Sequence, residues 1–360
     1  MNRPMLVGSY GMTGSTHWLA SAAAMSVLER GGNAFDAAAA GGFVLQVVEP
    51  HLNGPGGEVP ILLWSERDQR VQVVCGQGVA PAAATIQAFE QLGINEIPGA
   101  GLLAATVPGA FGGWLLMLER WGSWPLRDVL SYAISYARSG YPAIPGICTT
   151  VEGIAQTFRD RWPTSAVQWL PGDRPPVPGS QLTNPTLADT YERIIREAEA
   201  ASSDREGQLE AARSAWYDGF LAEALGRFST GTSWWDPTGE VHSGLLTADD
   251  MAAWRPTIEE PATYDYGRYT VCKTQAWGQG PVFLAQLALL SGFDLDGMGH
   301  LSPDYLHTVV ECSKLAFADR EAWYGDAPGV EDLPRKLVDD AYVAERRTLV
   351  GDTASFELRP

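Results

Sequence analysis

The segment 34–48 constrains the fold more than any other part of the sequence. It consists of AFDAAAAGGFVLQVV, in which small or apolar residues occupy almost every position. A helix that is apolar on all sides has to be buried on all sides, because no face of it is suited to water. Asn33 precedes the segment and Asp36 lies three residues later, which is close to a capping box. We therefore predict a helix over 34–48, packed between other helices in a globular protein.

A loop rich in proline and glycine follows this helix. Residues 49–57, EPHLNGPGG, interrupt any regular hydrogen-bond ladder. Gly54, Gly56 and Gly57 allow backbone N–H groups to come close to an oxyanion or carboxylate, and a tight turn between helix and strand is the alternative. Glu58 follows directly and is a candidate substrate contact, with a solvated or capping role as its alternative. The loop is the first candidate for a binding site.

The rest of the chain alternates between predicted helices and strands. Ser15 or Thr16 can cap a helix that ends near Glu29. A hairpin of buried strands is predicted at 59–64 and 71–75, a strand at 268–273, and helices from after Pro108 to about 121 and at 125–140, 185–198, 206–226, 280–290 and 303–323. The proline-rich residues 141–185 predict a long ordered excursion over the surface. With no repeat and no composition break, the sequence predicts one mixed α/β (α+β) domain over 1–360.

Charge and hydropathy exclude several classes of partner. The formal net charge of -18 repels polyanions, which argues against nucleic acid and anionic membranes. No uninterrupted apolar run reaches about 18 residues, and the N-terminus lacks the charged and apolar regions of a signal peptide. The sequence predicts a cytoplasmic location, or a periplasmic or secreted one if a leader has been removed.

The common motifs of self-contained enzymes are absent from the sequence. It contains no H-E-x-x-H, no G-x-x-x-x-G-K-[ST], no G-x-S-x-G and no C-x-x-C-H. The four cysteines lie far apart, and only His300 and His307 among the five histidines are close together, at a poor spacing for metal ligands. The sequence therefore predicts no metal and no organic cofactor.

A series of short segments is similar, in order and spacing, to γ-glutamyltransferases. They are GSYGM at 8–12, STHWLAS at 15–21, RGGNAFDAA at 30–38, VEPH at 48–51, GPGG at 54–57, APAAAT at 80–85, TVPGA at 106–110, ARSGY at 137–141, LTADD at 246–250 and KLAFADR at 314–320. The likeness runs from about residue 8 to Arg347 and is weakest in the proline-rich region and at 200–240. Ordered agreement in separate segments is specific, so the chain resembles the large subunit of that family.

The resemblance implies an N-terminal-nucleophile hydrolase with a four-layer αββα sandwich. In that family a precursor cleaves itself, and the new N-terminal threonine of the small subunit attacks an amide carbonyl with its own α-amino group as base. No such strand is found here, since Thr353 is followed by Ala-Ser-Phe. The resemblance therefore implies that this chain carries no catalytic residue, that a small (β) subunit from the same precursor completes the sandwich, and that a small-molecule amide is the substrate.

One departure from the family concerns substrate recognition. γ-Glutamyltransferases have an Arg-Glu-x-Ala-Pro run whose arginine grips the substrate's α-carboxylate, and QGVAP stands at the matching residues 77–81. Loss of a paired charge costs roughly 2 to 5 kcal/mol, so Gln77 argues against ordinary γ-glutamyl specificity. In the alternative, Arg70 or an arginine of the small subunit takes over. Glu58 and the turn WGQG at 277–280 also differ from the family pattern.

Three functions stay open on this basis. The first is an amide hydrolase or acylase similar to cephalosporin (glutaryl) acylases or to amidohydrolases of small monoamides such as oxamate. The second is a true γ-glutamyltransferase or glutathione hydrolase with a displaced arginine. The third is an inactive family member that acts as a binding protein. In all three, Gln77, Gly54, Gly56, Gly57 and Glu58 are the candidate substrate-binding residues of this chain.

Overall fold

The computed structural model describes residues 5–327 and 329–359. Contacts within the chain divide it into two compact units. Unit 1 comprises residues 5–59 and 76–257, and unit 2 comprises 60–75 together with the described residues from 258 onward. The prediction of a single domain over 1–360 stays a prediction. No helix among the described residues is both long enough and apolar enough to span a membrane.

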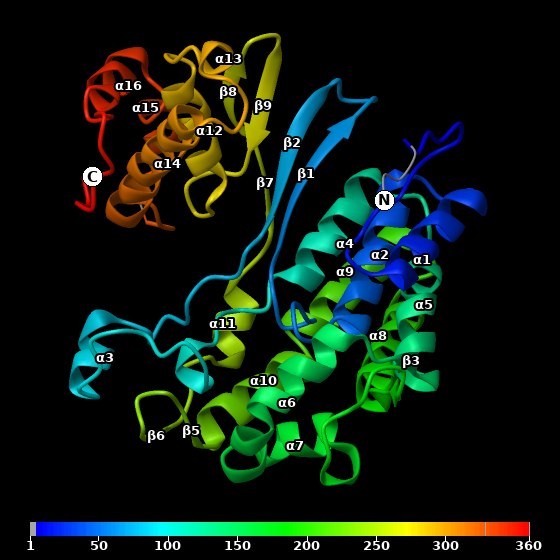
Figure 1. Ribbon diagram of the computed structural model, residues 1–360. Helices are drawn as coiled ribbons and strands as arrows, with labels where there is room; N and C mark the ends of the chain where they lie inside the picture. The colour runs from blue at the N-terminus through cyan, green and yellow to red at the C-terminus, as the bar shows by residue number, and fades with distance from the viewer. Residues whose placement is uncertain (1–4, 328, 360) are drawn as a thin grey trace. The chain divides into compact units, whose positions relative to one another are not determined.

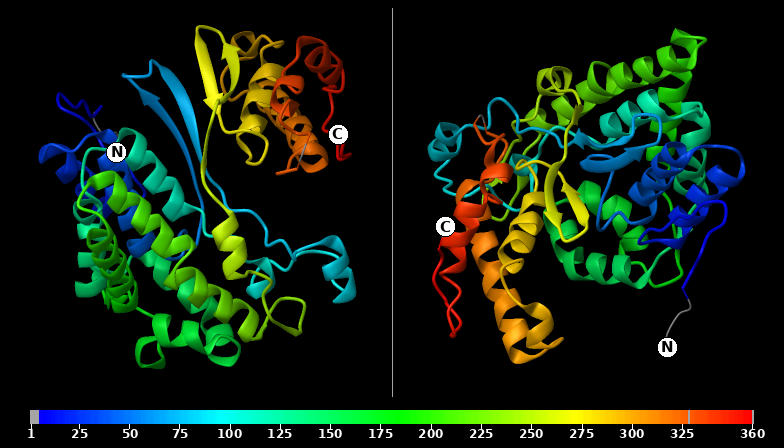
Figure 2. Two further views of the ribbon diagram at one scale, coloured as in Figure 1. Left: turned by 180° about the vertical axis from the view of Figure 1, so that it is seen from behind. Right: turned by 90° about the horizontal axis from the view of Figure 1, so that it is seen from above.

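Unit 1 is mainly a bundle of helices (Figures 1 and 2). Its helices are α1 (Trp18–Glu29), α2 (Ala34–Val48), α3 (Ile86–Gln91), α4 (Ala110–Trp121), α5 (Leu126–Ser139), α6 (Pro145–Asp160), α7 (Pro163–Trp169), α8 (Pro185–Ala201), α9 (Arg205–Tyr217), α10 (Phe220–Gly231) and α11 (Ala248–Ala253), with 3-10 turns η1 (Leu102–Ala104) and η2 (Pro171–Asp173). Two short antiparallel pairs join β3 (Tyr141–Pro142) to β4 (Gln181–Leu182) and β5 (Trp234–Trp235) to β6 (Val241–His242).

Helix α2 lies in the interior of this bundle, as its composition predicts. It packs against α1, α4 and α5, and the side chain of Phe43 is fully buried. The Phe43 ring lies 5.9 Å from the rings of Phe111 and Tyr191, and Phe111 stacks on Trp216 at 4.2 Å between centroids. Such aromatic contacts add to the burial of apolar surface that stabilises the unit.

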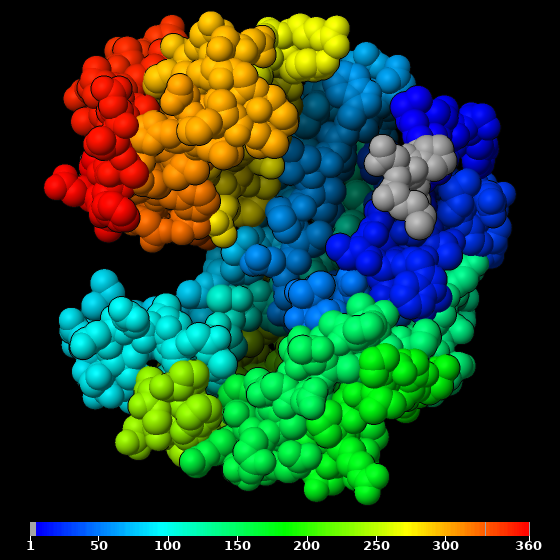
Figure 3. All heavy atoms as spheres, viewed as in Figure 1, coloured from blue at the N-terminus to red at the C-terminus, as the bar shows by residue number. Residues whose placement is uncertain are grey.

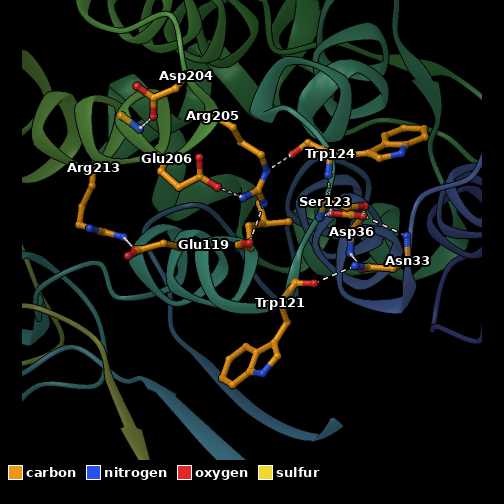
Figure 4. A network of polar contacts seen from close by, with 12 residues as sticks. Asn33, Asp36, Glu119, Trp121, Ser123, Trp124, Asp204, Arg205, Glu206 and Arg213 are labelled. Carbon is orange, nitrogen blue, oxygen red and sulfur yellow. Dashed lines mark hydrogen bonds and ion pairs between the residues drawn. The ribbon is translucent and has the colours of Figure 1, made fainter. Parts of the chain in front are cut away.

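A polar network fixes the start of α2 to the neighbouring helices (Figure 4). The predicted capping box is confirmed, because Asn33 accepts from the Asp36 N–H and Asp36 accepts from the Asn33 N–H at 2.9 Å. The same buried carboxylate accepts from the N–H and hydroxyl groups of Ser123 and from the Trp124 N–H, just after α4. Arg205, at the start of α9, donates to the Trp124 carbonyl at 3.0 Å. Asp36 therefore caps α2 locally and also connects this helix to the segment after α4.

The start of α1 differs from the prediction. The N-cap is His17, whose Nδ1 accepts from the Leu19 N–H at 3.1 Å, so the helix begins after both predicted caps. Ser15 donates instead to the His17 carbonyl, and the Thr16 hydroxyl donates to Glu49. The prediction at Ser15 or Thr16 was wrong because the Ser15 hydroxyl bonds locally to His17 and Ser21, while the Thr16 hydroxyl bonds to Glu49, which is distant in sequence.

The proline-rich region 141–185 also differs from the predicted surface excursion, because it contains the helices α6 and α7. Pro145 and Pro163 stand at the first turns of α6 and α7. A proline is tolerated there, since the N–H group that it lacks has no partner within the helix.

The predicted helix at 206–226 is two helices, α9 and α10, with a break before Phe220.

Unit 2 combines small sheets with helices. The strands β1 (Val59–Ser65), β2 (Arg70–Gly76) and β7 (Thr257–Glu259) form a sheet in the order β1-β2-β7, and β8 (Ala262–Tyr266) pairs antiparallel with β9 (Tyr269–Lys273). The helices are α12 (Gly280–Leu290), α13 (Leu295–Met298), α14 (Pro303–Trp323), α15 (Leu333–Lys336) and α16 (Asp340–Arg347). Helix α14 begins at the predicted residue 303, and Ser302 caps it by accepting from the Tyr305 N–H at 3.1 Å.

The predicted hairpin forms, but β1 is less buried than its composition suggests. Its alternate residues Pro60, Leu62 and Trp64 are exposed. In a strand, alternate residues share a face, so one apolar face of β1 is uncovered within the described part of the chain.

Candidate functional site

The end of β2 crosses the segment before α4 at a distance that only glycine permits. A Cβ atom added at Gly78 would lie 1.6 Å from the Val107 carbonyl oxygen, and one at Gly109 would lie 2.2 Å from the Gly76 oxygen. The Val107 N–H donates to the Val79 oxygen at 3.0 Å across the same crossing. The backbone on both sides of Gln77 is therefore fixed against the start of α4.

A second contact fixes the segment beyond Gln77. The Ala82 N–H donates to Asp250 at 2.8 Å, and Asp250 also forms a capping box with Thr247 at the start of α11. Burial raises the pKa of the Asp250 carboxyl, but the hydrogen bonds from Ala82 and Thr247 outweigh burial and hold that pKa below its usual range. An ionised Asp250 thus tethers the segment that corresponds to the arginine-containing run of the family.

The side chain of Gln77 is half-buried, and its amide makes no hydrogen bond with any residue that the structure describes. Glu58, at the end of the glycine loop, is exposed and likewise has no hydrogen-bonding or ionic partner among the described residues. Both predicted side chains are therefore available to groups outside this chain. Their roles in binding stay predictions.

The loop of Gly54, Gly56 and Gly57 is a turn tied to α4. The Gly57 N–H donates to the Gly54 oxygen at 3.0 Å, and the Gly57 oxygen accepts from the Ala110 N–H at 2.9 Å. Yet neither Gly54 nor Gly56 has a positive φ, and a Cβ atom at either would meet nothing within 4 Å. The alternative of a tight turn is correct for the geometry, but it does not explain why glycine stands at these two positions.

Arg70 does not lie beside Gln77. It begins β2, whereas Gly76 ends it, and six residues of strand span about 20 Å at about 3.3 Å per residue. Arg70 also pairs with Glu260, with 2.9 Å between the guanidinium nitrogen and the carboxylate oxygen. The geometry of β2 therefore argues against replacement of the family's arginine by Arg70.

The altered turn at 277–280 is engaged within unit 2. The Trp277 indole N–H donates to Glu259 at 2.8 Å, and the Gln279 side chain accepts from Arg320. Trp277 and Gln279, two of the residues that differ from the family pattern, are therefore explained by contacts inside unit 2.

A buried polar cluster near the glycine loop was not singled out by sequence reasoning. The Thr16 hydroxyl donates to the Glu49 carboxylate, which is buried, and His17 is only 1% exposed. Because His17 Nδ1 accepts a backbone hydrogen bond, the neutral ring carries its proton on Nε2. Neither His17 Nε2 nor His51 Nδ1 has a partner among the described residues. His51 lies three residues before Gly54, so the cluster stands at the base of the loop.

The environment of His17 favours the neutral imidazole. Burial lowers its pKa most strongly, the nearby Glu49 carboxylate opposes this by raising the pKa, and His51 lowers it further. A buried N–H donor without an acceptor costs about 1 to 3 kcal/mol, which makes it a candidate for contact with a group outside the chain. The only sequence signal was the occurrence of His17 and His51 next to helix ends, which spacing rules for metal ligands do not detect. No cluster of three or more metal-ligating side chains occurs among the described residues.

Comparison with known proteins identifies the family. Residues 20–360 match the family model described as gamma-glutamyltranspeptidase. The chain therefore belongs to the γ-glutamyltranspeptidase family.

Three curated relatives illustrate the range of this family. The glutathione hydrolase-like YwrD proenzyme of Bacillus subtilis is 32% identical over 100% of this chain and 64% of its own length. The acylase ACY 1 proenzyme of a Pseudomonas species is 33% identical, over 95% of this chain and 59% of its own length. The oxamate amidohydrolase proenzyme of Klebsiella pneumoniae is 28% identical, over 93% of this chain and 59% of its own length. The family thus includes the predicted acylase and oxamate branches, and this chain spans about three fifths of each relative.

Solved structures agree on the fold. The structure of LmbA2991T421A matches with a TM-score of 0.94 and 54% identity, over 99% of this chain and 60% of that chain. The gamma-glutamyltranspeptidase of Helicobacter pylori matches with a TM-score of 0.85 and 25% identity, over 99% of this chain and 97% of that chain. The predicted α/β (α+β) fold of N-terminal-nucleophile hydrolases is confirmed.

Proposed function

We propose that this chain is the large-subunit part of an autoprocessed amide hydrolase or acylase, with the nucleophilic threonine on a small subunit from the same precursor. The relatives named above are proenzymes, and the chain corresponds to about three fifths of each. Its candidate site consists of backbone groups, the Gln77 amide and the Glu58 carboxylate without an activated nucleophile, which suits a large subunit that binds substrate while its partner performs the chemistry.

We further propose that the acyl group of the substrate does not make the usual α-carboxylate contact of a γ-glutamyl group. The observation that carries this proposal is Gln77, a neutral side chain that is free of internal partners at the position of the family's arginine. An amide offers hydrogen bonds but no ion pair, so it suits a neutral acyl end or a shorter acid better than an amino-acid head group. Amides of oxalic acid, whose carboxylate adjoins the acyl carbonyl, fit this description, and amides of glutaric acid lack the ammonium group of the amino-acid head group.

The remaining residues of the site supply contacts rather than catalysis. The N–H groups of Gly54 and Gly56 form no hydrogen bond with the described residues and are donors for a carbonyl or carboxylate oxygen. Gly57 anchors the loop to α4 through its oxygen. Glu58 contributes an unpaired carboxylate at the exposed edge of the loop, for a polar group of the substrate. The reaction requires no metal or organic cofactor in this scheme.

The test is an assay of the full-length, processed protein. Release of amine is measured from a γ-glutamyl anilide, a glutaryl anilide and an oxalyl anilide at equal concentrations. We expect kcat/KM for the glutaryl or oxalyl compound to exceed that for the γ-glutamyl compound at least tenfold. Gln77→Arg should raise γ-glutamyl turnover, because it restores a charge partner. Gln87→Arg adds the same charge on exposed α3 and is the matched control, which should change nothing.

The second candidate is a true γ-glutamyltransferase or glutathione hydrolase, which the name of the Bacillus subtilis relative favours. In that case an arginine of the small subunit binds the α-carboxylate, and the wild-type protein prefers the γ-glutamyl anilide. An inactive binding protein would process none of the three compounds. Either result refutes the acylase proposal.

A further inference from the structure

The residue at which α2 ends is one that local interactions disfavour there. Glu49 is the C-cap of α2, and it is only 3% exposed. A carboxylate at this position meets the negative end of the helix dipole and loses most of its contact with water. The last turn of α2 contains no basic residue that would compensate for this. Residues that break such local rules are expected mainly at functional sites.

The backbone of Glu49 forms the base of the glycine loop. Its carbonyl accepts from the N–H groups of Leu52 at 3.0 Å and Asn53 at 3.2 Å, and from the Asn53 side-chain amide at 3.3 Å. Asn53 directly precedes Gly54, and its side chain also donates to the Leu45 carbonyl at 3.3 Å. A movement of Glu49 would therefore also move the segment that begins with Gly54.

A hydrogen bond from a distant segment fixes the Glu49 side chain. The Thr16 hydroxyl, 33 residues earlier in the chain, donates to the Glu49 carboxylate. Thr16 is itself held by its neighbours, because the Ser15 hydroxyl donates to the His17 carbonyl at 2.7 Å and His17 caps α1 through its Nδ1 atom. The segment before α1 and α1 itself lie at the surface of unit 1 (Figure 3, dark blue), yet His17 is only 1% exposed. The start of α1 is thus a firm support for Glu49.

The loop has further contacts on either side of its free N–H groups. A Cβ atom added at Gly146, in the first turn of α6, would lie 3.0 Å from the Nε2 atom of His51, so the ring of His51 packs against the start of α6. At the far end of the loop, the Gly57 oxygen accepts from the Ala110 N–H of α4 at 2.9 Å. The loop is therefore attached to its surroundings at both ends.

We propose that Glu49 is a positioning residue for substrate binding. Its hydrogen bond with Thr16 holds the N–H groups of Gly54 and Gly56 in the arrangement that binds an oxygen atom of the substrate's acyl group, and Glu49 itself does not touch the substrate. Donors that are held in place before binding avoid the entropic cost of ordering the loop. The inference rests on the proposed function in assigning these N–H groups to the substrate.

The first experiment measures kcat and KM of the full-length, processed protein with the anilide that the wild type hydrolyses best. Glu49→Ala should raise KM at least fivefold and leave kcat within twofold, because the loop binds the acyl group and takes no part in the chemistry. Glu49→Gln should keep KM within twofold of wild type, since its amide oxygen still accepts from Thr16. An unchanged KM in Glu49→Ala, or an equal rise in both variants, would overturn the proposal.

Gln46→Ala is the matched control for loss of stability. Gln46 lies on α2 one turn before Glu49, is 7% exposed and accepts from the Tyr191 hydroxyl at 3.2 Å, a buried tertiary hydrogen bond that does not involve the loop. Both alanine variants should lower the urea concentration at which the protein unfolds, but only Glu49→Ala should raise KM. If KM rises equally in both, it responds to stability in general, and the positioning role is refuted.

A second measurement is independent of substrate. Hydrogen–deuterium exchange with mass spectrometry follows a peptide that covers residues 50–57, in which the N–H groups of Leu52, Asn53 and Gly57 are hydrogen-bonded. Its exchange should be at least fivefold faster in Glu49→Ala than in wild type or Gln46→Ala. Unchanged exchange would overturn the positioning role. Faster exchange in a protein whose wild type hydrolyses none of the anilides would refute the proposed function and still support the hold of Glu49 on the loop.

Discussion

Two glycine-rich regions of unit 1 look alike in sequence but differ in what they require. At the β2–α4 crossing, Gly78 and Gly109 are needed because a Cβ atom would strike backbone at 1.6 Å and 2.2 Å. In the glycine loop, Gly54 and Gly56 have open space and no positive φ. Packing within this chain requires glycine at the crossing, whereas nothing in the described chain requires it at Gly54 and Gly56, and we propose that these two leave room for a substrate or the small subunit. The two regions thus differ in whether this chain's own packing explains the glycine.

The largest expected effect is the loss of stability in Gly78→Ala. The added Cβ atom can be relieved only by movement of backbone, which costs about 3 kcal/mol or more. Urea unfolding of the full-length protein, followed by circular dichroism, measures the change. An unfolding free energy within about 0.5 kcal/mol of wild type would show that the crossing is looser than described.

Asp250→Ala should have the next largest effect. It removes the acceptor of the Ala82 N–H and the capping box of α11, which together are worth about 1 to 3 kcal/mol. Asp249→Ala is the control, since Asp249 lies in the same first turn and is exposed. The same unfolding measurement applies, and equal effects of the two substitutions would contradict a tethering role for Asp250.

Gly56→Ala should leave stability within about 0.5 kcal/mol of wild type and yet reduce amidase activity at least tenfold. The methyl group has room inside this chain but would stand in the way of a substrate or small subunit. Gly99→Ala is the matched control, because a Cβ atom there also meets nothing within 4 Å. If both variants keep full activity, the loop glycines do not serve binding and the comparison fails.

The smallest effect concerns the pH dependence contributed by His17. Burial lowers its pKa in the folded state, so the folded protein binds this proton less readily than the unfolded chain does. The contribution of His17 is complete above the ordinary histidine pKa of about 6.5 and is lost as pH falls from there through the lowered folded value. His17→Asn should therefore be less sensitive to acid than wild type. Unfolding free energies at pH 7.5 and pH 5 check this, and parallel slopes would contradict it.

Helix positions were predictable where interactions between residues close in sequence determine them. The capping box of Asn33 and Asp36, helix α12 over Gly280–Leu290 and helix α14 after Ser302 were all recognisable from residues within one or two turns. The prediction failed at the start of α1, because the Thr16 hydroxyl donates to Glu49, which is distant in sequence. It also failed at 141–185, where the positions of Pro145 and Pro163 are compatible with helix starts as well as with extended chain.

The candidate site was predictable only in part. The resemblance identified the glycine loop and Gln77 from short segments in sequence. It left open whether Arg70 could replace the missing arginine, and the length of β2 and the pairing with Glu260 argue against this alternative. The polar cluster of His17, Glu49 and His51 could not be predicted, because its members become neighbours only when the ends of α1 and α2 meet.

The sequence by itself determined the family and the buried helix α2, and it raised the hypothesis that Gln77 stands where the family has its arginine. These follow from residue identity and from interactions between near neighbours, which a linear pattern preserves. Only the tertiary structure decided which glycines are sterically required, which buried polar atoms lack partners and how the Glu49 side chain is tied to the start of α1. Burial and close approach depend on contacts between segments far apart in the chain, and no local pattern specifies those contacts.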